Sequence, residues 1–262
     1  MRDGVGREHT SGMSETLPRL PDDDFARVLC VVAHPDDMEY GSSAAVATWV
    51  RRGARARYLL LTKGEAGMDN TEPERTKEIR TAEQEAACRA VGVERVDFLD
   101  HPDGTLLYGL DLRRDIAAAI REFRPDVVVT GSWEVEFVQG MLNQADHRVA
   151  GLASLDAVRD AGNRWVFPDQ LTDGVEPHAV RWLLVSGDPA PTHGVEVDEE
   201  AHEAAVASLE AHGAYLASIS WHPTARQLVT MVTGMMGKAL GTERGVLFRA
   251  YDFQAPPPFP ED

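Results

Sequence analysis

The sequence predicts an α/β domain with a mostly parallel sheet, helices on both faces and a C-terminal elaboration. Short apolar runs rich in β-branched residues alternate with longer segments of helical spacing. This strand–helix rhythm is typical of parallel strands joined by crossover helices. The 262 residues, of which 43% are apolar and 26% charged, are enough for a sizeable core.

The first two strands are short apolar runs, and each is followed by a helix. Residues 27–33 (RVLCVVA) and 55–62 (RARYLLLT) have the composition of buried strands. Between them, residues 42–52 show helical spacing that Gly53 ends. Residues 72–91 then form a charged amphipathic helix. These segments make up the first two strand–helix units of the predicted fold.

The same alternation continues through the middle of the chain. Strands are predicted at residues 95–99, 126–130 (DVVVT) and 180–186, and helices at residues 111–123 and 146–161.

The rhythm weakens toward the C-terminus, where the elaboration is expected. Residues 198–216 form a predicted helix with Asp198 as its cap. Residues 224–240 favour another helix, interrupted by two glycines, and residues 245–253 favour a late strand.

Composition and charge exclude several classes of protein. The net charge of −17 repels nucleic acid and anionic lipid, so neither is an expected partner. No apolar run approaches the ~20 residues that span a bilayer, and the first residues lack the apolar region of a signal peptide. Cys30 and Cys88 lie in apolar surroundings and are expected to be reduced. We therefore expect a cytoplasmic protein, with a mobile leader at 1–24 and a single domain at 25–262.

Polar residues follow four of the predicted strands. The strings are 34–37 (HPDD), 63–67 (KGEAG), 100–104 (DHPDG) and 146–147 (DH). Ligands of open α/β sheets bind beyond the carboxyl ends of the strands. The sequence therefore predicts that these side chains face one rim of the sheet.

The string HPDD has the residues of a metal site. Zinc in catalytic sites takes three nitrogen or oxygen ligands from the protein and keeps one position for water. His34 and Asp37 would supply two ligands, and His147 would supply the third from farther along the chain. Asp36 lies between two ligands and would be free to act as a general base on the bound water. Alternatively, Asp36 and Asp37 only cap the next helix.

Other strings favour different interpretations. Asp103-Gly104 is an ordinary turn signal, so a turn or substrate loop is favoured there over a metal site. Residues 63–67 are glycine-rich but match neither G-x-G-x-x-G nor a P-loop. A G-x-S-x-G string is missing from the sequence, and neither cysteine ends a strand. A serine or cysteine nucleophile is therefore not expected.

Four strings in order resemble one family, the PIG-L/LmbE-like deacetylases. They are 33–37 (AHPDD), 62–67 (TKGEAG), 103–104 (DG) and 146–147 (DH). The resemblance runs from about residue 27 to about 162. It implies a Rossmann-like fold and a zinc-dependent N-acetylglucosaminyl deacetylase.

The resemblance also implies roles for individual residues. His34, Asp37 and His147 would be the zinc ligands and Asp36 the general base. Further roles follow from the same match: substrate binding by Arg80, contacts to sugar hydroxyls by Asp103, and a catalytic role for Asp146 as the acidic partner of the last ligand. Alternatively, Arg80 is an exposed helix arginine that pairs with a nearby glutamate.

One position departs from the family pattern. The family often has His-Pro-Asp-His where residues 144–147 read QADH. Gln144 can donate a hydrogen bond, so we expect it to bind substrate, but it cannot donate a proton. The candidates for the acid are then His212, His101, or Asp36 after it has taken the proton of water.

The expected function is that of a hydrolase with one zinc or other divalent ion per chain. It would remove an acetyl group from the amide nitrogen of an N-acetylglucosamine-type conjugate, a small-molecule partner. The alternatives are an amidase that cleaves a larger acyl group from a thiol-sugar conjugate, and a non-catalytic sugar-binding module. Asp36 argues against the module, because binding alone does not need a base. The sequence leaves the oligomeric state open, a homo-oligomer included.

Overall fold

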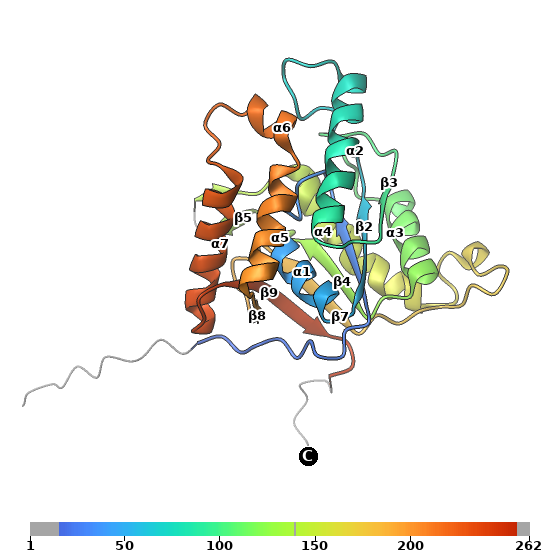
Figure 1. The fold of residues 1–262 in the computed structure, drawn as a ribbon. Helices are drawn as coiled ribbons and strands as arrows, with labels where there is room; N and C mark the ends of the chain where they lie inside the picture. The colour runs from blue at the N-terminus through green and yellow to red at the C-terminus, as the bar shows by residue number, and fades with distance from the viewer. Residues whose placement is uncertain (1–15, 139, 256–262) are drawn as a thin grey trace, which may run out of the picture.

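A seven-stranded sheet forms the centre of the protein (Figure 1). The computed structural model describes residues 16–138 and 140–255. The strands of the sheet are β1 (Arg27–Val32), β2 (Arg55–Leu60), β3 (Arg95–Phe98), β4 (Val127–Gly131), β7 (Trp182–Ser186), β8 (His193–Glu196) and β9 (Gly245–Asp252). Their spatial order is β3-β2-β1-β4-β7-β9-β8. The first five are parallel, and β9 runs antiparallel to both of its neighbours.

Helices cover both faces of this sheet (Figure 1). They are α1 (Ser43–Arg51), α2 (Pro73–Ala90), α3 (Leu110–Phe123), α4 (Ala145–Gly162), α5 (Glu199–Glu210), α6 (Gly213–Ser218) and α7 (Ala225–Leu240), with a 3-10 turn at Pro168–Gln170. Side chains of α1, α2, α5 and α7 share one apolar core, and those of α3 and α4 share the other. The sheet therefore separates two hydrophobic cores.

Strand β1 contributes to both cores, because successive side chains of a strand point to opposite faces. Val28 and Cys30 lie in the core beneath α1 and α5, whereas Leu29 and Val31 lie in the core beneath α3 and α4. A strand buried on both faces has an unbroken apolar sequence instead of an alternating one. This explains why the unbroken apolar run of β1 predicts a buried strand so clearly.

The predicted fold class is confirmed, with some differences in the C-terminal part. The helix expected over residues 198–216 is two helices, α5 and α6, which are separated near His212. Helix α7 continues through its glycines, where an interruption was expected. Gly237 lies against the backbone of Arg244, and a Cβ there would come within 2.8 Å of it. A residue without a side chain is needed at position 237 for this close approach, so Gly237 does not mark a break in the helix.

Three short strands were not predicted. Strand β8 contains a glycine and only four residues. The hairpin of β5 (Glu136–Val138) and β6 (Met141–Leu142) is shorter still and forms its own two-stranded sheet. The glycine in β8 and the two or three residues of each hairpin strand leave too few side chains for a period to be recognised.

The chain packs against the domain earlier than expected. Residues 1–15 of the expected leader lie outside the described residues. The Leu17 N–H donates to the Ala239 carbonyl, and the Leu20 N–H donates to the Gly194 carbonyl, both at 2.8 Å. Leu20 is buried in the core. Residues 17–20 of the expected leader therefore pack against the domain, and the boundary at residue 25 stays a prediction.

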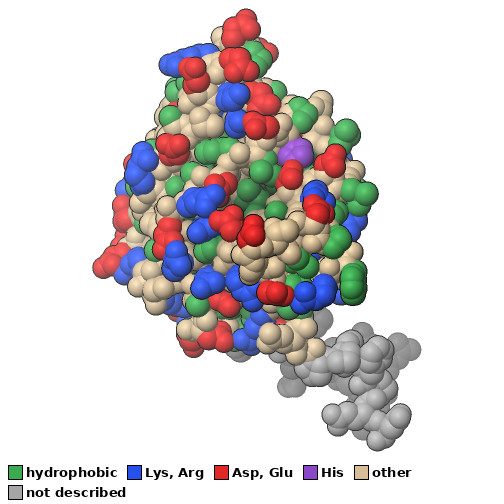
Figure 2. Space-filling view, turned by 90° about the vertical axis from the view of Figure 1, so that its right-hand side faces the viewer, with side chains coloured by type: hydrophobic (Ala, Val, Ile, Leu, Met, Phe, Trp, Pro, Cys, Tyr) green, Lys and Arg blue, Asp and Glu red, His purple; other side chains and the backbone are tan. Residues whose placement is uncertain are grey.

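The surface charges, the two cysteines and the helix lengths can be compared with what the composition predicts. Acidic and basic side chains are interspersed on the face that Figure 2 shows. Cys30 and Cys88 are buried free thiols. Over the described part of the chain, none of the helices is both long and apolar enough to cross a bilayer.

Arg121 anchors the end of α4, the helix that carries the last predicted ligand. Its guanidinium is buried and donates hydrogen bonds to main-chain carbonyls of Asp160, Ala161, Asn163, Val166 and Phe167. Truncation removes these donors and leaves a cavity. Each unsatisfied buried carbonyl costs about 1–3 kcal/mol.

We expect Arg121→Ala to lower the free energy of unfolding by at least about 3 kcal/mol. Chemical denaturation followed by circular dichroism measures this change. Arg121 lies in α3, and Arg114 is a more exposed arginine of that helix. Arg114→Ala is therefore the matched control, and it should lower the free energy of unfolding by less than about 1 kcal/mol. Equal losses in the two variants would contradict the anchoring role.

Candidate active site

The three predicted ligands meet at the carboxyl edge of the parallel strands. His34 and Asp37 lie in the loop after β1, and His147 lies in the first turn of α4. Donor atoms of the three residues lie within 4.8 Å of one another. His147 Nε2 is 3.0 Å from Asp37 Oδ1, and His34 Nδ1 is 3.7 Å from Asp37 Oδ2. The fold thus brings together residues that are 110 positions apart in the sequence.

In each of the two histidines, one ring nitrogen lies close to polar side chains. His34 Nε2 lies 3.0 Å from an Asp103 oxygen and 3.4 Å from an Asp146 oxygen. His147 Nδ1 lies 3.2 Å from the Asn143 side-chain oxygen. Contacts of this kind fix the ring and its tautomer, and leave the other nitrogen for a metal. The arrangement fits a metal centre.

The charges of the site also fit a cation. Burial lowers the pKa of His34, but the charge of Asp37 and hydrogen bonds to Asp103 and Asp146 outweigh it and raise that pKa to about 12. Burial raises the pKa of Asp37, but the two histidines hold it well below its usual range. The carboxylates therefore stay ionised and favour positive charge between them. A bound metal would take that place once the imidazoles were neutral.

A second set of possible ligands shares His34 and includes Asp103 and Asp146. The Asp146 carboxylate is already held by the main-chain N–H groups of Gly104 and Leu106, at 2.8 and 3.1 Å. These contacts favour Asp103 and Asp146 as supports of His34. The two nitrogens and the carboxylate of the first set match the donors of catalytic zinc sites better.

Asp36 has surroundings of its own, although it lies between two of these residues. Its φ of +82° is in the left-handed region, and its side chain is buried beside Arg80, with Oδ1 3.0 Å from the guanidinium. Burial raises the pKa of Asp36 and Arg80 lowers it, and the resulting pKa is about 6. A carboxylate with such a pKa suits general base catalysis near neutrality.

Comparison with known proteins identifies the family of the chain. A family model described as PIG-L, GlcNAc-PI de-N-acetylase, matches residues 29–158. The chain belongs to the PIG-L family. This confirms the family expected from the sequence.

Two curated relatives of this PIG-L family protein are named deacetylases. Diacetylchitobiose deacetylase of Thermococcus kodakarensis is 28% identical over 181 residues, which cover 68% of this chain and 66% of the relative. A 1D-myo-inositol 2-acetamido-2-deoxy-alpha-D-glucopyranoside deacetylase of Kineococcus radiotolerans is 33% identical over 198 residues, which cover 61% of this chain and 54% of the relative. The chain thus spans between about half and two thirds of the length of these relatives.

A solved structure has the same fold. N,N'-diacetylchitobiose deacetylase from Pyrococcus horikoshii superimposes with a TM-score of 0.78, covering 91% of this chain and 89% of its own, at 21% sequence identity. The likeness extends well beyond residues 29–158, so the C-terminal helices belong to the common architecture.

Arg80 is less accessible than a substrate-binding residue was expected to be. It is 3% exposed, donates to the Pro35 carbonyl and packs on the Tyr215 ring, 3.9 Å from the ring centre. The backbone after β2 also covers it, because a Cβ on Gly64 would lie 2.8 Å from the guanidinium. Arg80 therefore acts on Asp36, and direct contact with substrate stays a prediction.

The remaining predicted residues have different surroundings. Gln144 is exposed at the start of α4, and its side chain makes no capping hydrogen bond. His101 Nε2 is 3.0 Å from Asp115, and His212 is fully buried with Nε2 3.6 Å from Glu39. Each histidine considered as the acid thus contacts a carboxylate outside the ligand set, which is His34, Asp37 and His147. Asp36 is the candidate that adjoins it.

Two residues of the site were not predicted from the sequence. Asn143 donates to the carbonyls of Ser132 and Glu134, at 2.7 and 3.0 Å, which turns its oxygen toward His147. Its position four residues before His147 at a helix start was a signal that could have revealed it. Tyr215 has no such signal, because it lies outside the segment with family motifs.

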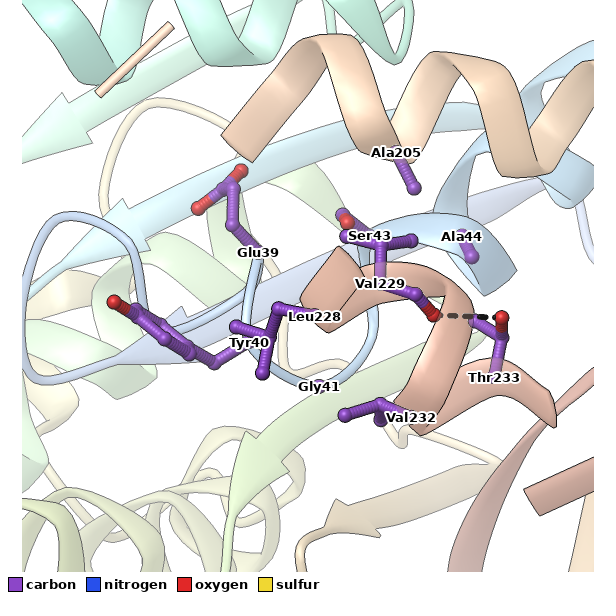
Figure 3. A pocket seen from close by; sticks show the side chains of 10 residues that line it. All are labelled: Glu39, Tyr40, Gly41, Ser43, Ala44, Ala205, Leu228, Val229, Val232 and Thr233. Atoms are coloured by element: carbon purple, nitrogen blue, oxygen red, sulfur yellow. Dashed lines mark hydrogen bonds between the residues drawn. The ribbon is translucent and has the colours of Figure 1, made fainter. Parts of the chain in front are cut away.

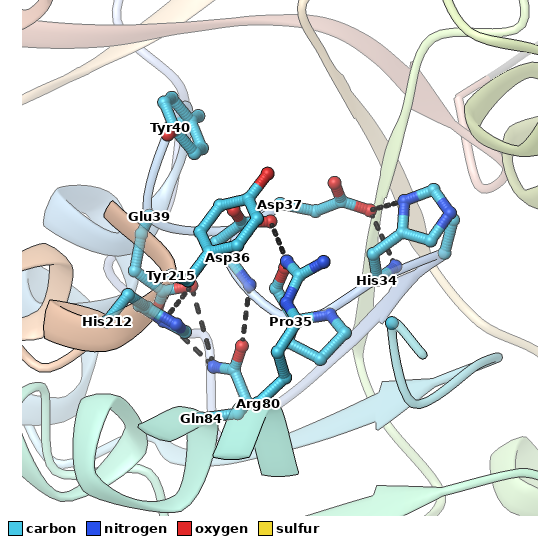
Figure 4. A network of polar contacts seen from close by, with 12 residues as sticks. His34, Pro35, Asp36, Asp37, Glu39, Tyr40, Arg80, Gln84, His212 and Tyr215 are labelled. Atoms are coloured by element: carbon cyan, nitrogen blue, oxygen red, sulfur yellow. Dashed lines mark hydrogen bonds and ion pairs between the residues drawn. The ribbon is translucent and has the colours of Figure 1, made fainter. Parts of the chain in front are cut away.

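The Tyr215 hydroxyl points toward Asp36 and Asp37 (Figure 4). Burial raises the pKa of Tyr215 to about 12, and the charge of Asp36 adds to this effect. The phenol therefore keeps its proton at neutral pH and can donate a hydrogen bond beside the ligand set.

The contact between Arg80 and Asp36 gives a prediction for protonation. The positive charge of Arg80 favours the ionised carboxylate, so Arg80→Met should raise the pKa of Asp36 above about 6. A smaller fraction of Asp36 is then ionised at pH 7. Titration of the Asp36 carboxyl carbon by NMR, in chelator-treated protein, measures the change.

Lys77→Met is the matched control, because it removes a more exposed charge of the same helix. It should leave the Asp36 titration nearly unchanged. An unaltered pKa in Arg80→Met would mean that Arg80 does not set the charge of Asp36.

Proposed function

We propose that this protein is a metal-dependent N-deacetylase that removes the acetyl group of an N-acetylglucosamine-type conjugate. The observation that carries the proposal is the pair of adjacent carboxylates with different partners. Asp37 faces two histidines and Asp36 faces Arg80. One carboxylate suits a metal and the other suits proton transfer, and metal-assisted hydrolysis of an amide uses both.

We propose one zinc or other divalent ion per chain, held by His34, Asp37 and His147. Such an ion supplies Lewis acidity, which polarises a carbonyl group and makes water more acidic. Asp103, Asp146 and Asn143 would hold the two imidazoles in the orientation that the ion requires.

Asp36 is the residue proposed to move the proton. It takes a proton from the attacking water, the oxygen forms a bond to the acetyl carbon, and the carbon–nitrogen bond then breaks. Asp36 returns the proton to the leaving nitrogen, so that the products are an amine and acetic acid, which loses its proton to become acetate. A group with a pKa of about 6 can accept the proton and release it again near neutrality.

The names of the relatives support an acetamido sugar as the substrate. One relative is named for diacetylchitobiose and the other for a 2-acetamido-2-deoxy-glucopyranoside of inositol. Both names describe an acetylated amine on a glucose ring. The substrate proposed here shares that group, and the proposal extends to no particular second half of the conjugate.

A larger acyl group is the second candidate, because apolar side chains are exposed near the site. Leu107 is 82% exposed and Leu142 is 69% exposed. Leu107 follows Leu106, whose N–H binds Asp146, and Leu142 precedes Asn143. An apolar acyl chain could lie on these residues, which would make the protein an amidase of broader range.

The experiment that tests the function follows the hydrolysis of a panel of N-acylated glucosamine conjugates. The panel varies the acyl group from acetyl to octanoyl at fixed sugar, and the assay quantifies the free amine. We expect the acetyl conjugate to react, a chelator to abolish the reaction and zinc to restore it. Preference for octanoyl would favour the amidase, and binding without turnover of any conjugate would favour a sugar-binding module.

Metal analysis of variants tests the ligand set. Purified protein should contain about one equivalent of divalent metal per chain. Asp37→Ala and His147→Ala should each lose most of it, because three protein ligands are too few to spare one. Full metal content in His147→Ala, measured by elemental analysis, would place the ion elsewhere.

Asp36→Asn separates the base from its neighbour. The amide keeps the shape of Asp36 but cannot take a proton, so kcat should fall by ~10²–10⁴-fold, toward the upper end for an amide substrate, while metal content stays normal. Steady-state kinetics and elemental analysis of the same preparation measure both. Near-normal deacetylation by this variant would overturn the mechanism.

A further inference from the structure

A buried polar cluster lies behind Asp36, away from the ligand set (Figure 4). Its members are Glu39 from the loop after β1, Gln84 from α2, Ser208 from α5, and His212, which follows α5. All four side chains are buried. The proton transfer proposed above uses none of them, and Ser208 and His212 lie beyond the segment that matches the family model.

Gln84 connects this cluster to Asp36. Its side-chain oxygen accepts a hydrogen bond from the Asp36 N–H at 2.8 Å, in a buried position. Asp36 is held at a φ of +82°, which costs a residue other than glycine about 1 kcal/mol or more. A conformation of this cost persists only where the surroundings hold it. The hydrogen bond from Gln84 is a contact of the required kind.

Glu39 determines which way the Gln84 amide points. Both Glu39 oxygens lie 3.5 Å from the Gln84 nitrogen, and one of them accepts from the Ser208 hydroxyl at 2.9 Å. The NH₂ group of Gln84 thus faces two carboxylate oxygens, while the Asp36 N–H donates to the other end of the same amide. The carbonyl oxygen of Gln84 is thereby directed toward the Asp36 N–H.

The surroundings of Glu39 keep this arrangement dry. His212 Nε2 lies 3.6 Å from Glu39, and both side chains are fully buried, so the imidazole is placed to balance the carboxylate charge. On another side Glu39 borders a cavity of about 10 Å³, lined mostly by apolar and small side chains of α1, α5 and α7 (Figure 3). That space holds about one water molecule. Gln84 itself is buried, so bulk water does not compete for its amide.

We propose that Gln84 is a positioning residue for Asp36, and that Glu39 orients it. The proposal rests on the function proposed above, in which Asp36 moves the proton. Through Ser208 and His212, the C-terminal helices then take part in the reaction without contact to substrate.

The test is Gln84→Met, which keeps the length of the side chain and removes its hydrogen bonds. With Asp36 no longer held, kcat for the acetyl conjugate should fall about 10–100-fold, while KM and metal content stay normal. In the Asp36→Asn background the same change should cost nothing further, because the group that Gln84 positions is already lost. Additive losses would assign Gln84 a structural role and overturn the proposal.

Hydrogen exchange gives a reading that does not depend on activity. The Asp36 amide should be protected in the native protein and exchange much faster in Gln84→Met. Thr76→Val is the matched control, because Thr76 is another fully buried polar residue of α2. Its hydroxyl donates to the Thr71 carbonyl, and the substitution removes that hydroxyl. That variant should lose stability without changing Asp36 exchange or kcat.

Glu39→Gln tests the orienting step and serves if Gln84→Met fails to fold. An amide at position 39 can donate as well as accept, so it no longer forces the Gln84 amide into one orientation. Exchange of the Asp36 amide should rise, and kcat should fall by less than in Gln84→Met. Unchanged exchange in both variants would overturn the proposal. A native protein that deacetylates nothing would overturn the proposed function, and Asp36 exchange would still decide whether Gln84 holds the loop.

Discussion

Two carboxylates with like charge, Asp36 and Asp37, are adjacent in a loop that is largely removed from water. Repulsion and desolvation both favour protonation of such a pair. The left-handed φ of Asp36 relieves the conflict, because it turns the two side chains toward different partners. Asp36 meets Arg80 and Asp37 meets His147. The remaining architecture of the site follows from the need to supply these partners.

The partners come from separate parts of the chain, and the sheet brings them together. The central strand β1 ends at the loop, α2 supplies Arg80, and α4 supplies His147. Tyr215 of α6 covers the outer side of Arg80, and the Glu83 side chain accepts from the Ala214 N–H at 2.6 Å, which ties α6 to α2. The chemistry of one short string thus depends on packing between elements nearly 140 residues apart.

Sequence patterns were sufficient where a physical signal is local. The apolar run of β1 predicted a buried strand, and HPDD at its end predicted two candidate ligands that the fold brings together with His147. Burial of Arg80 was not predictable, because α2 is strongly charged and its inner face is recognised only once the loop with Gly64 covers it. The break between α5 and α6 was missed, although Gly213 follows His212 at this point and was a local signal for it.

In the proposed mechanism, Gln144 leaves the transfer of protons to another group. A histidine there could hold a second proton, so that base and acid would be different groups. With an exposed amide at position 144, the group adjoining the ligand set that can carry the proton of water onward is Asp36. Its pKa must then be high enough to hold the proton and low enough to be ionised before the reaction. Burial raises that pKa, Arg80 limits the rise, and the balance near 6 meets both needs. The surroundings of Asp36 are therefore matched to a site in which one carboxylate serves as base and then as acid.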